Sequence, residues 1–194
     1  DYDSEFRYAG RPIPALASLD KHQRTLYIGS FSKVFSDGLR LGFLVVPQAL
    51  ISQFALQVSQ QGLQASIMPQ RPLALFMQQG DFYRHIRRVR RIYAERRQIL
   101  IHLLQEHLSD WIRFDDHRAG MVLSVMLKAE ICDTEVSQRA QQSDITCVAL
   151  SKYYHSTTKT NGLVLGFCSF TGEEMEQGMR KLKEIIQHLA ACSA

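Results

Sequence analysis

The sequence predicts an α/β protein that ends in a smaller α+β domain. Two β-rich apolar runs, residues 25–29 and 41–46, flank a polar turn. A long helical pattern covers residues 82–108. Beyond residue 111, short apolar runs alternate with helical patterns. This last arrangement is typical of an antiparallel sheet with helices on one of its faces.

The composition is that of an ordinary globular protein. Of 194 residues, 45% are hydrophobic and 22% are charged, and a chain of this length can bury a substantial core. No apolar run approaches the roughly 18 residues that span a bilayer. The first residues, DYDSEF, lack the basic and apolar regions of a signal peptide. We therefore expect a cytoplasmic protein without a membrane partner.

The first two apolar runs predict a pair of buried strands, and residues 30–40 form the turn between them. Because this connection is too short for a crossover helix, the strands are expected to be antiparallel. A short helical turn is expected before them, at residues 15–20. After them, Pro47 suits the start of a helix with an apolar face, and Gly80 suits the end of a second helix over residues 72–79.

The longest predicted helix contains most of the local positive charge. Asp81 is expected to be its N-cap, and seven arginines fall between Arg84 and Arg97 against the single acid Glu95. Basic side chains on a helix can bind nucleic-acid phosphates. The more common alternative is a solvated face whose aliphatic stems cover apolar surface.

The C-terminal part predicts a mixture of short strands and two helices. Strands are expected at residues 111–114, 121–127, 145–150 and 163–168. Asp133 is expected to cap a helix that runs to about residue 141, and Thr171 is a possible N-cap of the last helix. The expected core stripe of that last helix is Met175, Met179, Leu182, Ile186 and Leu189.

The turn between the first two strands contains the residues that suggest chemistry. Lys33 lies among apolar and small residues, where the charged form of an amine is disfavoured, and Schiff-base chemistry needs a neutral amine. A hydroxyl at Ser30 and a planar guanidinium at Arg40 suit a phosphate. Together they outline a pyridoxal phosphate site. The alternative is a surface hairpin with one lysine and one arginine at its mouth.

Two motifs resemble known proteins. The segment SFSKVFSDGLRLGFLVVP resembles the cofactor-lysine segment of class I aminotransferases. The opening DYDSEFRY, followed by RPIPALASLD, resembles the MocR-type regulators of the GntR family. In those bacterial regulators, a winged-helix DNA-binding domain is fused to an aminotransferase-like domain.

This resemblance implies the C-terminal portion of a fold-type-I aminotransferase. Residues 1–80 would complete the large pyridoxal-phosphate-binding domain, residues 81–110 would form a linking helix, and residues 111–194 would form the small α+β domain. Lys33 would form the Schiff base with pyridoxal phosphate, and Ser30 and Arg40 would hold its phosphate. Tyr2 would hydrogen-bond the ring hydroxyl of the cofactor.

Two departures from the family pattern bear on function. The family places the aspartate that pairs with the pyridine nitrogen two residues before the tyrosine, whereas this chain starts one residue before Tyr2. Asp1 is therefore not assigned that role. Aminotransferases also place an arginine for the substrate carboxylate near the loop before Leu163, where this chain has Lys159. Lys159 is a candidate substrate-binding residue, and a solvated surface lysine is the alternative.

Three functional hypotheses follow. The first is an effector-sensing domain of a transcriptional regulator, with an amino acid, an amine or pyridoxal phosphate as effector. It would act as a homodimer and contact DNA only through an N-terminal domain absent from this chain. The second is an aminotransferase that acts on an amino acid. The third is a structural or dimerisation module whose site has decayed.

The remaining candidate sites have simpler interpretations. Cys132, Cys147, Cys168 and Cys192 are far apart and show no metal-binding spacing, so reduced thiols are expected. Asp115, Asp116 and His117 could form a metal site with Glu130. A polar hairpin turn is the alternative favoured for that segment, so no metal is expected.

Overall fold

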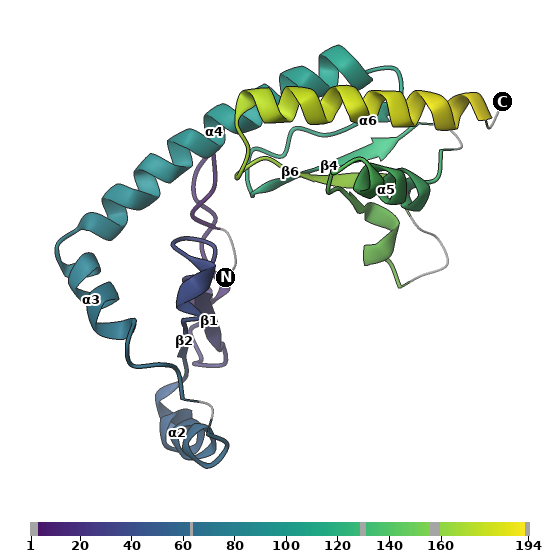
Figure 1. Cartoon of the computed structure of the whole chain (residues 1–194). Coiled ribbons are helices and arrows are strands. Elements are labelled where there is room, and N and C mark those ends of the chain that lie inside the picture. Colours follow the sequence, from purple (N-terminus) through teal and green to yellow (C-terminus); the bar gives the residue numbers. More distant parts are fainter. Residues whose placement is uncertain (1–3, 63, 129–130, 156–159, 193–194) are drawn as a thin grey trace. The chain divides into compact units, whose positions relative to one another are not determined.

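The computed structural model describes residues 4–62, 64–128, 131–155 and 160–192. The chain forms two compact units, residues 1–90 and 91–194, and the boundary between them falls inside the long helix α4 (Asp81–Leu108) (Figure 1). The division expected at residues 80 and 110 stays a prediction. None of the helices in the described ranges is long and apolar enough to cross a membrane.

The first unit is organised around an antiparallel hairpin. Strand β1 (Tyr27–Ser30) pairs with β2 (Gly42–Val45) in a register that sets Tyr27 opposite Val45 and Ser30 opposite Gly42. The antiparallel arrangement expected from the short connection is confirmed. The other elements of this unit are α1 (Leu16–Leu19), the 3₁₀ helices η1 (Asp37–Leu39) and η2 (Gln48–Leu50), α2 (Ile51–Gln60), α3 (Gln70–Gln78) and the start of α4.

The expectation that both strands are buried is wrong. Every residue of β2 is exposed, and the side chains of Ile28 and Val45 are 64% and 55% exposed. Among the described residues the hairpin is a two-stranded sheet. An apolar run indicates that a segment favours a strand, but burial depends on how many layers cover it, which the run does not encode.

The core of the first unit fixes the turn of the hairpin onto α3 and α4. Leu41, Leu73, Phe82 and Ile86 form its buried centre. Phe31, in the turn, meets Phe82 of α4 edge-to-face, with ring centroids 6.1 Å apart. Further residues packed on this cluster are Val34, Leu39, Phe76 and Met77. The turn is therefore positioned by tertiary packing as well as by its own hydrogen bonds.

The second unit contains a four-stranded antiparallel sheet in the order β3-β4-β6-β5. Its strands are β3 (Ile112–Arg113), β4 (Val122–Leu127), β5 (Val148–Ala149) and β6 (Gly162–Gly166). The helices are the C-terminal part of α4, α5 (Asp133–Gln142), the 3₁₀ helix η3 (Leu150–Tyr153) and α6 (Gly172–Cys192). All four expected strands are present, and those at 111–114 and 145–150 are shorter than expected.

Among the described residues, the two faces of this sheet differ in burial. On one face, Leu123 and Val125 of β4 and Leu165 of β6 are buried. On the opposite face, Val122 and Met126 are exposed. The whole expected core stripe of α6 is buried, and α6, yellow in Figure 1, runs alongside the sheet. The expected α+β arrangement is confirmed.

Helix α6 begins with a capping box. The hydroxyl of Thr171 accepts a hydrogen bond from the Glu174 N–H at 3.2 Å, and the Glu174 carboxylate accepts from the Thr171 N–H at 2.7 Å. These two bonds satisfy donors that a helix start leaves without partners. The bond from the Thr171 backbone is also the main reason that the pKa of Glu174 lies below its usual value.

Asp133 joins three segments of the second unit instead of capping its own helix. Its carboxylate, 2% exposed, accepts hydrogen bonds from the N–H and the hydroxyl of Ser151, each at 2.8 Å, and from the Gly162 N–H at 3.2 Å. The Asp133 N–H donates to Asn161 Oδ1 at 2.9 Å. Asp133 therefore ties the start of α5 to η3 and to the start of β6.

We expect Asp133→Ala to lower the free energy of unfolding by about 3 kcal/mol, because it leaves three buried donors without their acceptor. Glu135→Ala is the matched control on the same helix, since its contact with Arg139 is an exposed pair four residues apart. Urea unfolding followed by circular dichroism measures both. Equal stabilities of the two variants would contradict the role of Asp133.

The arginine run on α4 is not uniformly solvated. Arg84, Arg87, Arg88 and Arg91 are exposed, as the solvated-face alternative expects. Arg97 is 1% exposed, pairs with Asp116 and donates to the His117 carbonyl at 3.1 Å. This side chain is a structural part of the second unit.

The four cysteines all lie in described ranges and are free thiols, as expected. Burial raises the pKa of Cys147 to about 11 and that of Cys168 to about 12. These two thiols therefore stay protonated and unreactive near neutral pH.

Candidate functional site

The turn between β1 and β2 closes into a compact loop. The Phe31 N–H donates to the Leu41 carbonyl at 3.0 Å, which extends the strand pairing by one step into the turn. Within the loop, the Phe35 N–H donates to the Phe31 carbonyl at 2.9 Å. The Ser36 hydroxyl accepts from the Gly38 N–H at 3.2 Å and caps η1. This closure brings the backbone at Ser30 and at Arg40 to the same mouth of the hairpin.

Lys33 lies in the first part of this loop, and its side chain is half-buried. Its neighbour Val34 packs on the core of the first unit, and so does Phe31 two residues before it. Lys33 is thus attached to a segment that is fixed on both sides. The role of Lys33 as the cofactor lysine stays a prediction.

Ser30 is half-buried at the end of β1, and its hydroxyl accepts a hydrogen bond from the Ser32 N–H at 3.3 Å. It also lines a cavity of ≈ 180 Å³ in the first unit. The other lining residues are Ser4, Glu5, Tyr27, Gly29, Phe31, Val34, Phe43, Met77, Phe82 and Tyr83. The cavity therefore joins the N-terminal segment, the hairpin and the helices α3 and α4.

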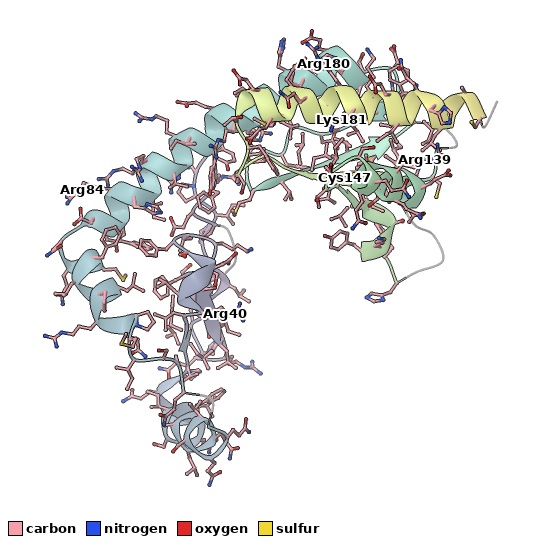
Figure 2. The ribbon with its side chains drawn as sticks, viewed as in Figure 1. Arg40, Arg84, Arg139, Cys147, Arg180 and Lys181 are labelled. Carbon is pink, nitrogen blue, oxygen red and sulfur yellow. The ribbon has the colours of Figure 1, made fainter. Side chains whose placement is uncertain are left out.

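Arg40 has an unusual backbone conformation. It follows η1 with φ 47° and ψ 39°, in the left-handed region, and its side chain is exposed (labelled in Figure 2). A non-glycine residue in this region costs roughly 1 kcal/mol or more, and such conformations cluster at ligand-binding sites. The backbone conformation is therefore a second reason, besides its charge, to treat Arg40 as a candidate ligand-binding residue.

Two glycines allow the strands to approach closely at this mouth. A Cβ atom on Gly29 would lie 2.3 Å from Phe43 Cζ, and one on Gly42 would lie 2.8 Å from the Gly29 carbonyl oxygen. The ring of Phe43 also lies near Phe31, with centroids 5.5 Å apart. A larger residue at Gly42 would meet backbone and force the strands apart beside Ser30, whereas one at Gly29 would require the Phe43 ring to move.

The structure describes only some of the other predicted cofactor, substrate and metal residues. Tyr2 and Lys159 lie outside the described residues, as does Glu130. Asp116 accepts from Arg97 and lies 3.6 Å from Arg118 Nε, so its carboxylate is committed to ion pairs. No cluster of three metal-binding side chains occurs within the described parts of the chain.

Sequence reasoning missed the cavity beside Ser30 and the contacts that shape it. Phe43 and Tyr27 were noted only as parts of apolar runs. Glu5 was part of a motif, and its link to Arg90 on α4 spans 85 positions in the sequence. No local pattern signals a contact over that separation.

The comparison with protein families decides the class of the chain. Residues 4–182 match the model of the aminotransferase class I and II family. The chain belongs to this family. The match covers the turn that carries Lys33 as well as the C-terminal α+β unit, so both units belong to one known architecture.

Curated relatives of this aminotransferase-family chain include transcriptional regulators. It is 36% identical over all 194 residues to the probable rhizopine catabolism regulatory protein MocR of Rhizobium meliloti, and covers 39% of that protein. It is 31% identical over 94% of its length to the uncharacterised HTH-type regulator YdeL of Bacillus subtilis, covering 40% of it. The resemblance to MocR-type regulators is thereby confirmed. The chain spans about two fifths of the length of these relatives.

Solved aminotransferases share the fold. The multiple substrate aminotransferase of Thermococcus profundus superposes with a TM-score of 0.87 at 25% identity, over 98% of this chain and 47% of that one. The α-aminoadipate aminotransferase LysN of Thermus thermophilus, complexed with N-(5'-phosphopyridoxyl)-L-leucine, also gives 0.87, at 27% identity, over 99% and 50%. The expected fold, part of a fold-type-I aminotransferase, is confirmed.

Proposed function

We propose that this aminotransferase-like chain is the pyridoxal-phosphate-binding, effector-sensing part of a bacterial transcriptional regulator. The observation that supports this most strongly is the 36% identity to MocR along the entire chain. The chain would be the C-terminal part of a longer, cytoplasmic protein that forms a homodimer. DNA would be contacted by an N-terminal domain outside this chain.

The residues of the turn fit pyridoxal phosphate in their donor chemistry. The cofactor supplies an aldehyde that condenses with a primary amine and a ring that withdraws electrons. Lys33 is the amine, held on the fixed segment between Phe31 and Val34. Ser30 and Arg40, at the mouth closed by the hydrogen bond between Phe31 and Leu41, offer a hydroxyl and a planar fork for the phosphate. Tyr2 would bind the ring hydroxyl.

The packing of the turn suggests how a ligand would be sensed. An amine or amino acid that competes with Lys33 for the aldehyde carbon would release the Lys33 side chain. Phe31 and Val34, on either side of Lys33, pack against Phe82 of α4 and the cluster around it. A change at Lys33 would therefore bias the packing of the turn on α4, and a ligand that binds two arrangements unequally shifts their populations.

The alternative function is steady-state transamination of an amino acid. It is favoured by the 27% identity to the 2-aminoadipate transaminase of Thermus thermophilus, over 96% of this chain. Lys33 would then also move the proton between the substrate carbon and the cofactor. The two functions differ in what a ligand changes, which is operator affinity in a sensor and product concentration in an enzyme.

The test uses the full-length protein and its operator DNA. With pyridoxal phosphate bound, a panel of amines and amino acids is titrated while fluorescence anisotropy reports operator affinity. We expect one chemical class to change the operator Kd by at least about 5-fold, the low end of typical allosteric coupling. Lys33→Ala should lose the response to these ligands.

An unchanged operator Kd across cofactor and ligand titrations would contradict the sensor function. Continuous product formation that Lys33→Ala abolishes would instead establish the aminotransferase. Lys21→Ala is the matched control in both assays, because Lys21 is exposed and lies outside the turn.

A further inference from the structure

A contact between α4 and the N-terminal segment holds one wall of the cavity beside Ser30. Arg90 Nε donates to the main-chain carbonyl of Glu5 at 2.6 Å, and Arg90 Nη2 lies 3.4 Å from the Glu5 carboxylate. Ser4 and Glu5 line the cavity together with Ser30. Both partners belong to the first unit, although 85 positions separate them in the sequence.

The main-chain bond matters more than the ion pair. The side chains of Arg90 and Glu5 are 41% and 49% exposed, so their ionic contact alone contributes little. A charge-assisted bond to a carbonyl, in contrast, fixes the backbone itself. The next residue, Phe6, is 0% exposed. The segment is thus fixed at two consecutive residues, by Arg90 at Glu5 and by burial at Phe6.

We propose that Arg90 is a positioning residue for the cofactor site. It anchors the Ser4–Phe6 segment against helix α4 and so fixes the part of the cavity wall that Ser4 and Glu5 form, in the cavity that Ser30 also lines. This inference rests on the proposed function, because it assigns Arg90 a part in binding pyridoxal phosphate. Arg90 itself does not touch the cofactor. Its effect passes through the backbone of Glu5.

The experiment compares three variants of the full-length protein. Arg90→Ala removes both contacts to Glu5. Glu5→Ala removes the carboxylate and keeps the main-chain carbonyl that Arg90 Nε binds. Arg87→Ala removes an exposed arginine from the same helix. Equilibrium dialysis gives the Kd for pyridoxal phosphate, and hydrogen exchange of residues 4–8 without cofactor reports on the anchor.

We expect Arg90→Ala to raise the Kd about 10-fold and to accelerate exchange in residues 4–8, since one charge-assisted bond is lost at a partly exposed position. Arg87→Ala should change the Kd less than about 2-fold, within the range of ordinary surface substitutions. Glu5→Ala should raise the Kd less than Arg90→Ala does, because the main-chain carbonyl that Arg90 Nε binds is kept. Arg90→Lys, which restores a donor without the planar fork, should lie between wild type and Arg90→Ala.

The outcomes separate this inference from the function on which it rests. If wild-type protein binds no pyridoxal phosphate, the proposed function fails and the inference with it. If wild type binds and Arg90→Ala binds equally tightly, the inference alone is overturned. A lower melting temperature of Arg90→Ala with an unchanged Kd also overturns it, because Arg90 would then serve stability only.

Discussion

Substitution of Lys33 by alanine is expected to abolish stable retention of pyridoxal phosphate. The bond between the lysine amine and the aldehyde is the covalent link in the proposed site, whereas Ser30 and Arg40 supply only phosphate contacts. We expect the Kd to rise at least about 100-fold, equal to about 2.7 kcal/mol. Cofactor content after gel filtration of the full-length protein measures this loss directly.

The fold of the Lys33 variant should stay intact. Lys33 lies beside the core cluster of the first unit, and that cluster is formed by Leu41, Leu73, Phe82 and Ile86. Lys33→Ala should therefore unfold at nearly the wild-type denaturant concentration. Retention of cofactor by this variant at the wild-type level would exclude Lys33 as the attachment point, and Lys21→Ala should retain cofactor fully.

Substitution of Arg97 by alanine is expected to give a large loss of stability. The Arg97 side chain is 1% exposed, pairs with Asp116 and donates to the His117 carbonyl at 3.1 Å. The alanine variant loses the packing of a long buried side chain, its ion pair with Asp116 and its hydrogen bond to the His117 carbonyl. We expect the free energy of unfolding to fall by about 3 kcal/mol, measured by urea denaturation.

Three further variants separate charge from packing at this site. Arg97→Met keeps a long side chain without the charge, so its loss should be smaller than that of Arg97→Ala. Asp116→Ala leaves the buried cation without its carboxylate and should destabilise by about 2 kcal/mol, since Asp116 is 46% exposed. Arg91→Ala, on the exposed face of the same helix, should stay within about 0.5 kcal/mol of wild type. Equal losses for Arg91→Ala and Arg97→Ala would contradict a structural role for Arg97.

Features set by local sequence were predicted well. The core stripe of α6 follows from helical periodicity, and Thr171 was predicted as its N-cap, which its bond from the Glu174 N–H confirms. The antiparallel hairpin follows from the length of its connection, which leaves no room for a crossover helix. The position of the turn that carries Lys33 was predicted because the two apolar runs mark where the strands end and begin again.

Features set by distant partners were not predicted. The run on α4 contains seven arginines, and the sequence does not indicate which of them is buried. Arg97 is buried, and it pairs with Asp116, nineteen residues further along the chain. Asp133 was expected to cap α5, but Ser151 and Gly162 are the donors that it accepts from. The exposure of β2 likewise depends on which elements cover it.

The candidate site also combines features that local sequence sets with features that depend on the fold. The residue types at positions 30, 33 and 40 indicate phosphate and aldehyde chemistry, because hydroxyl, amine and guanidinium groups have fixed donor properties. The left-handed conformation of Arg40 was not predictable, since that region favours glycine and Gly38 lies two residues earlier. The anchor from Arg90 to Glu5 required the folded arrangement of the first unit.

The most direct test of the account is to locate the lysine that pyridoxal phosphate modifies. The full-length protein is incubated with the cofactor, reduced with borohydride, digested, and its peptides are identified by mass. The account predicts a pyridoxyl adduct confined to the peptide that contains Lys33. Adducts spread over exposed lysines such as Lys21 and Lys152, or no adduct at all, would contradict it.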